Sequence, residues 1–317
     1  MWEGEHRRWV GAPPRARTEC AMTFNEGMQI DTSTTSSSGG GRGGGRGIAV
    51  GGGIGGLLIV VVALFLGVDP GTVLPEQQQI GTEGVQAPGF DLSQCKTGAD
   101  ANEFVQCRVV ATGNSLDAVW SQLKPDYTRP QVEIFSGSVD TRCGPATSAV
   151  GPFYCPADQT AYFDTDFFDV LRDQFGSSGG PFAQEYVVAH EFGHHVQQLQ
   201  GSLARAQEDP EGPTGGGVRT ELQADCYAGV WAHYAAVTTQ ESTGVPFLEP
   251  LTDKDIADAL SAASAVGDDR IQEAATGRVN PESWTHGSSE QRQKWFTVGY
   301  QTGDPTKCDT FATNDLG

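Results

Sequence analysis

The feature that most constrains this sequence is the stretch PFAQEYVVAHEFGHHVQQLQ, at residues 181–200. Apolar side chains recur in it at helical spacing, and Pro181 follows Ser-Ser-Gly-Gly, as is common at the first position of a helix. Gly201 is a typical residue to end such a helix. Gly193 costs about 1 kcal/mol relative to alanine inside a helix, so we expect another element to pack closely against it.

The expected helix carries HEFGH at positions 190–194. Side chains four residues apart on a helix are only about 40° apart around its axis, so His190 and His194 can bind the same zinc ion. Glu191 lies at the edge of the same face and can take a proton from a zinc-activated water. This pattern predicts a metal-dependent hydrolase. Because H-E-x-x-H also occurs by chance, a third ligand is needed to support the prediction.

A second segment, VRTELQADCYAGVWAH at 218–233, places two carboxylates four residues apart among apolar residues. Glu221 and Asp225 share a face of this expected helix, and a buried carboxylate needs a cation or hydrogen bonds. We interpret Glu221 as the third zinc ligand, which leaves a fourth position open for water. Asp225 would accept a hydrogen bond from the other ring nitrogen of a ligand histidine. An ordinary helix with solvated acidic residues is the alternative.

These segments carry a resemblance to the bacterial neutral zinc metallopeptidases of the YpfJ type, which are gluzincin-like zincins. The resemblance rests on HEFGHHVQ and ELQADCYAGVWAH, on CGPATSAVGPFYCPADQTAYFD at 143–164, and on HGSSEQRQKWFTVGY at 286–300. It covers roughly residues 91–317. It implies a peptidase in which His190, His194 and Glu221 hold zinc and Glu191 is the general base.

The same resemblance suggests how a substrate is held. In zincins an extended substrate pairs with an edge strand beside the metal, and residues 159–164 read as a strand ahead of the ligand helix. His286 precedes a helix that Ser288 and Gln291 would open with a capping box, so it could face the cleft and stabilise the oxyanion. A structural hydrogen bond is its alternative role. The residues expected on the edge strand are Thr160, Ala161, Tyr162 and Phe163.

Residues 47–68, GIAVGGGIGGLLIVVVALFLGV, are uncharged and long enough to cross a bilayer core of roughly 30 Å. Arg42 and Arg46 precede this run and Asp69 follows it, which places the N-terminus in the cytoplasm and the catalytic domain outside. A cleaved signal peptide is the alternative. We therefore expect a disordered cytoplasmic segment over 1–46, a transmembrane helix over 47–68, a linker over 69–90 and a zinc metallopeptidase domain over 91–317. Met22 is the start that we expect for the natural chain.

Six cysteines follow the apolar run, and an even number suggests disulfides formed in an oxidising compartment. Six cysteines allow fifteen pairings. Local spacing favours Cys95 with Cys107 and Cys143 with Cys155, which leaves Cys226 with Cys308. A free buried thiol at Cys226 is the alternative.

The sequence as a whole has 20 Lys and Arg against 40 Asp and Glu, a net charge of −20, so nucleic acid is a poor partner. We expect an α+β, zincin-like fold in which a small mixed sheet with an edge strand lies over two ligand helices, plus one N-terminal transmembrane helix. We expect one zinc ion per chain, a peptide or protein substrate, and attachment to the membrane. A membrane-tethered scaffold with a structural zinc, or a hydrolase of other amide or ester bonds, would share these residues.

Overall fold

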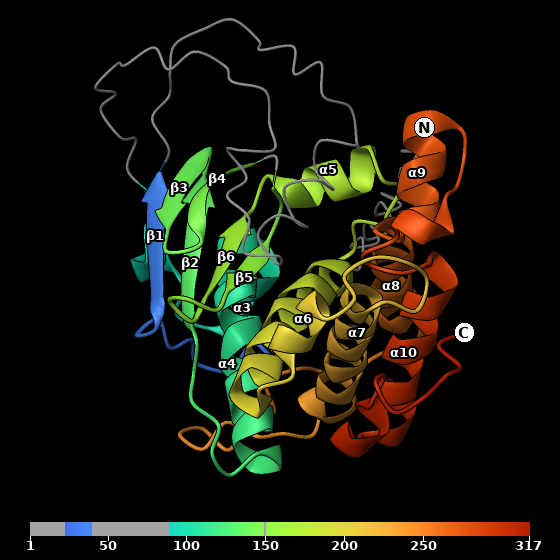
Figure 1. The fold of residues 1–317 in the computed structure, drawn as a ribbon. Coiled ribbons are helices and arrows are strands. Elements are labelled where there is room, and N and C mark those ends of the chain that lie inside the picture. The colour runs from blue at the N-terminus through green and yellow to red at the C-terminus, as the bar shows by residue number, and fades with distance from the viewer. Residues whose placement is uncertain (1–22, 40–88, 149) are drawn as a thin grey trace, which may run out of the picture.

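The structure is a computed structural model that describes residues 23–39, 89–148 and 150–317. It has small sheets on one side and helices on the other, as expected for an α+β protein (Figure 1). The strands are β1 (Thr35–Gly39), β2 (Gln131–Ser136), β3 (Ser138–Thr141), β4 (Gly144–Thr147), β5 (Phe153–Cys155) and β6 (Thr160–Asp164). The larger sheet has the order β1-β2-β6-β5, in which only β5 is antiparallel to its neighbour, and β3 pairs with β4.

Eight α-helices fall within the described residues, and short 3-10 helices connect some of them. The α-helices are α3 (Gly98–Glu103), α4 (Val105–Leu123), α5 (Phe167–Asp173), α6 (Pro181–Gln200), α7 (Gly216–Ala235), α8 (Asp253–Ala265), α9 (Asp268–Thr276) and α10 (Ser289–Thr302). The 3-10 helices are η1 (Leu92–Gln94), η2 (Leu203–Gln207), η3 (Pro281–Ser283) and η4 (Pro305–Cys308).

Helix α6 is the centre of the helical layer and contacts α4, α7, α8 and the strands β5 and β6. It begins at Pro181 and ends at a left-handed Gly201, as predicted. A Cβ on Gly193 would lie 3.0 Å from the Cα and carbonyl oxygen of Ala224, so only glycine lets α7 approach this closely. The ligand positions of the two helices are brought together by this contact.

Helix α10 packs along α7 on the side away from α6. A Cβ on Gly299 would lie 1.9 Å from the carbonyl oxygen of Cys226, so the two backbones touch. The predicted capping box of α10 is present, with Ser288 as the cap and Gln291 as its partner. The last turn of α10 therefore lies beside the middle of α7, and Gly287, which precedes the cap of α10, lies beside Val218 and Leu222 near the start of α7.

Three disulfides stabilise the fold, and the two pairings that spacing favoured and the third that remained are confirmed. They join Cys95 to Cys107, Cys143 to Cys155, and Cys226 to Cys308. The third closes the longest loop, with a sequence separation of 82, and links α7 to the C-terminal segment.

Residues 23–39 belong to the folded domain, so the expectation of disorder over 1–46 is wrong for this stretch, as is a domain start near residue 91. Phe24 and Met28 are fully buried, and β1 lies beside β2 in the sheet. The Ser/Thr/Gly-rich strand is stable because its backbone pairs with β2, and Ser36 faces Glu133 97 positions away. Composition could not indicate this pairing, because the low-hydrophobicity side chains contribute little to it.

No helix in the described part of the chain is long and apolar enough to cross a bilayer. The transmembrane helix expected over 47–68 and nearly all of the expected linker lie outside the described residues.

Candidate metal centre

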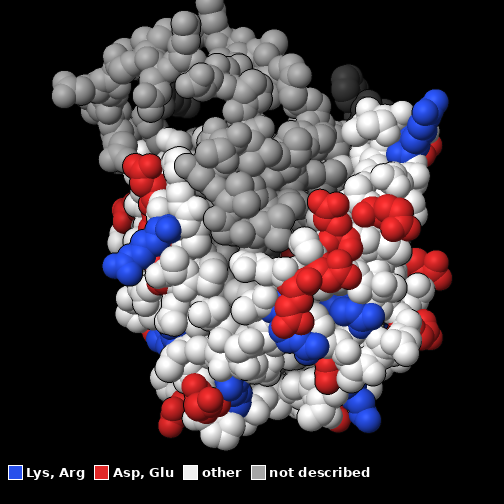
Figure 2. Space-filling model, in the orientation of Figure 1, with Lys and Arg blue, Asp and Glu red and all other residues white. Residues whose placement is uncertain are grey.

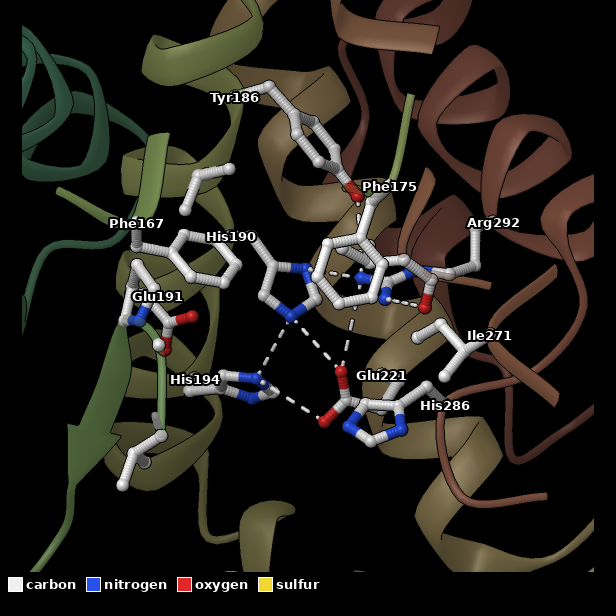
Figure 3. Close-up of a pocket in the computed structure, with 15 residues that line it drawn as sticks. Phe167, Phe175, Tyr186, His190, Glu191, His194, Glu221, Ile271, His286 and Arg292 are labelled. Carbon is white, nitrogen blue, oxygen red and sulfur yellow. Dashed lines mark hydrogen bonds and ion pairs between the residues drawn. The ribbon is translucent and has the colours of Figure 1, made fainter. Parts of the chain in front are cut away.

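Three buried side chains converge where α6 and α7 meet (Figure 3). His190 and His194 lie on α6, and Glu221 lies on α7. The Nε2 atom of His190 is 3.1 Å from that of His194 and 3.1 Å from Oε2 of Glu221. The Nε2 atom of His194 is 3.5 Å from Oε1 of Glu221. The sequence predicted these three residues as the metal ligands, and the fold brings them together.

Each ligand histidine is held through its second ring nitrogen. Nδ1 of His190 is 2.8 Å from Oδ1 of Asp225, and Nδ1 of His194 is 2.8 Å from Oε1 of Gln197. The amide of Gln197 is oriented by its own donation to the carbonyl oxygen of Thr220, at 2.7 Å. Because carboxylate and amide oxygens accept hydrogen bonds, each Nδ1 carries a proton and each Nε2 is directed into the cluster.

The protonation of the cluster fits a bound cation. Burial lowers the pKa of His194 to about 4, so its Nε2 presents a lone pair. Burial acts to lower the pKa of His190, but Asp225 and Glu221 raise it to about 9. Burial acts to raise the pKa of Glu221, but the two histidines hold it well below its usual range. One proton on His190 cannot satisfy all of these converging acceptors, whereas a divalent cation can.

The distances fit zinc as well. Tetrahedral zinc with Zn–N bonds of about 2.0–2.1 Å holds its ligand atoms roughly 3.3–3.5 Å apart. The separations between the three ligand atoms are 3.1 Å to 3.5 Å. Two imidazoles and one carboxylate are the usual protein ligands of a zinc site with an open fourth position. His190, His194 and Glu221 therefore form a potential zinc site.

Asp225 is the centre of a second group of residues behind His190. Arg292 of α10 donates to it from Nε at 2.8 Å and from Nη2 at 2.9 Å, and the hydroxyl of Tyr186 also donates to it. Burial acts to raise the pKa of Asp225, but Arg292 and His190 hold it below the ordinary value. The predicted partner role of Asp225 is confirmed, and it is an ionised acceptor fixed from three sides.

Glu191 is buried beside the cluster, on the opposite side from His286 in the view of Figure 3. Its carboxylate accepts a hydrogen bond from the backbone N–H of Tyr154, and its Oε2 has no partner. Burial and the nearby Glu221 raise the pKa of Glu191 to about 7, against the opposing charge of His190. A carboxylate with one unpaired oxygen and this pKa is suited to take up a proton near neutral pH.

His286 lies in the loop before α10 and lines the same cavity as the ligands. Its Nδ1 is 3.3 Å from Oδ1 of Asp268, and Oδ2 of Asp268 accepts the backbone N–H groups of Thr285, His286 and Gly287. Burial acts to lower the pKa of His286, but Asp268 and Glu221 raise it above the ordinary value. Asp268 thus fixes both the loop and the imidazole.

The cavity next to the metal cluster is mostly apolar. The polar side chains that line it belong to the cluster and its partners. The rest of the wall comes from the segment before β5, from α5 and the residues after it, from α6, from the residue that ends α8, and from α9. The apolar wall consists of Val150, Gly151, Pro152, Phe167, Phe175, Val187, Val266 and Ile271. A bulky apolar group can be buried here beside the cluster, whereas a charged group would lose its hydration.

The predicted edge strand is wrong in one respect. Residues Thr160–Phe163 lie in β6, which is hydrogen-bonded to β2 on one side and to β5 on the other. The edge strands are β1 and β5, and β5 is the one beside the site, because the N–H of its central residue, Tyr154, points to Glu191 rather than to β6. A strand of three residues is too short for its alternation to be recognised in the sequence, whereas β6 is longer and contains the apolar run Ala161, Tyr162 and Phe163.

Three residues of the site were not recognised from the sequence. Arg292, Asp268 and Gln197 come from three different elements, and each acts on a residue that was predicted. Gln197 carried a weak signal, because it lies one turn after His194 on the helical face that carries both ligand histidines. Arg292 and Asp268 carried none, since only the packing of α9 and α10 brings them to the site.

Two histidines and one glutamate on two packed helices form the kind of site that zinc-dependent hydrolases use. The chain matches the family described as "Putative neutral zinc metallopeptidase" over residues 23–311, and it belongs to that family.

Proteins from several bacteria are similar over most of their length. The uncharacterized protein Rv2575 of Mycobacterium tuberculosis (strain ATCC 25618 / H37Rv) is 75% identical over 296 residues, which cover 93% of this chain and 100% of that protein. The uncharacterized protein YpfJ of Escherichia coli (strain K12) is 39% identical over 263 residues, which cover 80% of this chain and 85% of that protein. No solved structure is significantly similar to the chain.

Proposed function

We propose that this protein is an active zinc endopeptidase that hydrolyses peptide bonds in the cavity beside His190, His194 and Glu221. The observation that carries the proposal is Glu191, a buried carboxylate with an unpaired oxygen at the wall of an apolar cavity next to the metal ligands. A site that only stabilises a fold is closed by four protein ligands and has no use for such a base.

The residues of the site take separate roles in the proposed reaction. Bound zinc would supply Lewis-acid activation of the water and of the scissile carbonyl. Glu191 accepts the proton of the attacking water and passes it to the leaving amine. His286 is placed to donate a hydrogen bond to the oxygen that becomes negatively charged in the transition state. Asp225 and Gln197 hold the ligand histidines in the tautomer that keeps Nε2 free.

The substrate backbone is proposed to pair with β5. The outer edge of β5 is unpaired within the described residues, and Tyr154 on this strand already contacts Glu191. An extended peptide added to this edge would donate to the carbonyl oxygen of Tyr154, whose N–H is already bound to Glu191, and it would run past the metal ligands. This assignment replaces the strand at 160–163.

The decisive experiment is peptide hydrolysis by the full chain in detergent, zinc-loaded, beside Glu191→Gln. The full chain is required, because a fragment that begins after the apolar run lacks β1. We expect the wild type to cleave a diverse peptide library, and Glu191→Gln to bind zinc equally while losing at least about 100-fold in kcat. Equal turnover by both would reject Glu191 as the base. Bound zinc without cleavage by either would favour the scaffold alternative.

We also propose that the chain associates with a membrane through residues 47–68. An uncharged apolar run of this length, flanked by Arg42 and Arg46, is typical of a membrane segment. Recovery of the full chain in the membrane fraction, and its release when residues 47–68 are deleted, would support the proposal. A wild-type chain found in the soluble fraction would reject it.

The charge of the described surface is unfavourable for binding nucleic acid. Acidic side chains predominate on the described part of the face shown in Figure 2, where basic side chains are scattered. The chain carries twice as many Asp and Glu as Lys and Arg. Such a surface repels polyanions and leaves peptides or proteins as the substrate class that the family implies.

A further inference from the structure

The stretch 23–39 is attached to the catalytic domain at many points on both sides of the site. Its backbone bonds to residues 96, 98, 132, 247 and 249, and Phe24 and Met28 fill the core. Thr23 donates a hydrogen bond to Glu185, which lies on the ligand helix α6 five residues before His190. The stretch is therefore a structural part of the domain that holds the metal site.

The chain leaves this stretch at Gly39 and re-enters the described structure at Gly89 in nearly the same place. A Cβ on Gly89 would lie 2.5 Å from the carbonyl oxygen of Ser37, so the two backbones are in direct contact. Ser37 is itself paired with Ile134 in the sheet. Both flanks of residues 40–88 thus start from one spot on the surface of the domain.

The apolar run 47–68 lies between these two flanks in the sequence. If that run crossed a bilayer once, the residues before and after it would lie on opposite faces, at least roughly 30 Å apart. Direct contact between Gly89 and Ser37 excludes this while β1 is paired with β2. A single crossing would also remove Phe24 and Met28 from the core and leave Glu185 without its hydrogen-bond donor.

We infer that residues 23–39 and 89–317 lie on the same face of the membrane, because the described flanks of the apolar run are in direct contact. The inference rests on the proposed membrane association, and it replaces the orientation with a cytoplasmic N-terminus and an external catalytic domain. The partner that we infer for the domain is a lipid surface. It would contact the end of the sheet where β1 ends at Gly39 and where Gly89 lies beside it.

The first test is a disulfide between β1 and β2 in the full chain, in membranes, with Cys20 replaced by serine. Ser36 and Glu133 are register partners whose side chains already touch, so Ser36→Cys with Glu133→Cys should cross-link within one chain on oxidation. The matched control is Ser36→Cys with Gln131→Cys, which is offset by two residues, or about 7 Å, and should not cross-link.

The second test is labelling of single cysteines by a membrane-impermeant maleimide in intact cells. Glu26→Cys and Asn314→Cys lie at exposed positions on either side of the apolar run. We expect the two positions to give the same result, both labelled or both protected until the cells are permeabilised. Labelling of one and protection of the other would overturn the inference.

Other outcomes are also decisive. A membrane-bound chain without the intrachain cross-link would overturn the inference, and a Ser36–Glu133 cross-link between two chains would show that β1 comes from a second copy. A chain in the soluble fraction would overturn both this inference and the membrane association. Peptide hydrolysis is measured separately, so loss of the proposed peptidase activity would not be confused with any of these results.

Discussion

Arg292 binds Asp225 through two parallel hydrogen bonds, from Nε to Oδ2 at 2.8 Å and from Nη2 to Oδ1 at 2.9 Å. Asp225 in turn accepts the Nδ1 proton of His190 at 2.8 Å. The guanidinium lies 3.9 Å from the nearest oxygen of Glu221 and is almost fully buried. One residue of α10 therefore fixes the carboxylate that orients a metal ligand of α6.

Arg292→Lys should weaken zinc binding by about 10-fold to 100-fold, because an ammonium cannot hold both oxygens of Asp225 in one plane. Competition with a zinc chelator measures this change without any assay of turnover. Tyr186→Phe, which removes a single donor to Asp225, is the matched control and should have a smaller effect. Unchanged zinc affinity in a folded Arg292→Lys protein would show that Arg292 only stabilises the packing of α10.

Asp268→Asn should lower kcat through His286 and leave zinc affinity unchanged. His286→Ala should lower kcat by about 100-fold, as expected for the loss of one hydrogen-bond donor to the transition state. If Asp268 acts only by positioning His286, the double variant will be no slower than His286→Ala. Additive losses in the double variant would assign Asp268 a separate role.

Glu185 should make stability depend on pH. Burial raises the pKa of Glu185 to about 7 from 4.5, against the opposing effects of Thr23 and Arg108, and Asp255 adds to the rise. Between these pH values the folded protein keeps a proton that the unfolded chain has lost. The contribution of Glu185 to stability is therefore greatest below pH 4.5, and it falls by about 3 kcal/mol as pH rises through 7.

Glu185→Gln should remove this loss of stability. The free energy of unfolding of the variant should therefore exceed that of the wild type at pH 8 and should not exceed it at pH 4.5. Denaturant unfolding at the two pH values measures the difference. Glu290→Gln, at an exposed position of α10, is the control and should leave the pH profile of the wild type in place. If Glu185→Gln raised the free energy of unfolding by the same amount at both pH values, Glu185 would not change its protonation on unfolding.

Phe24→Ala should destabilise the catalytic domain by about 3–5 kcal/mol, because Phe24 is fully buried although it lies in a stretch that composition assigns to a disordered tail. The midpoint of urea unfolding, followed by tryptophan fluorescence, measures the loss. Glu26→Ala, at an exposed position of the same stretch, should cost little. If Phe24→Ala were as mild as Glu26→Ala, residues 23–39 would not be part of the folding unit.

Several features of this protein were determined by local sequence. The bounds of α6, the cap of α10 and the three disulfides follow from residues that are close together in the chain or few in number. His190 and His194 share a helical face because the helix itself fixes their spacing. Glu221 could be predicted as the third ligand because a carboxylate among apolar residues of a helix needs a cation. This need follows from the cost of burying a charge and does not depend on knowing the fold.

Other features were decided only by the tertiary structure. The place of Arg292 beside Asp225, of Asp268 beside His286, and of β1 beside β2 depends on contacts between segments far apart in the chain. The edge strand was misplaced because hydrogen bonds between strands depend on the order of the sheet, and the three residues of β5 carry no periodic signal.

Local sequence and tertiary contacts also lead to different expectations for how the chain would be oriented at a membrane. Charge and hydropathy of residues 47–68 describe how one segment meets a bilayer, and they favour a single crossing. The pairing of Ser37 with Ile134 constrains where the flanks of that segment can be, and it opposes a single crossing. The sequence by itself indicated the three ligand residues, the proposed base Glu191 and the apolar run. The tertiary structure decided which residues hold the ligands in place and that residues 23–39 belong to the same folded domain, because backbone pairing and buried contacts join parts of the chain that no local pattern connects.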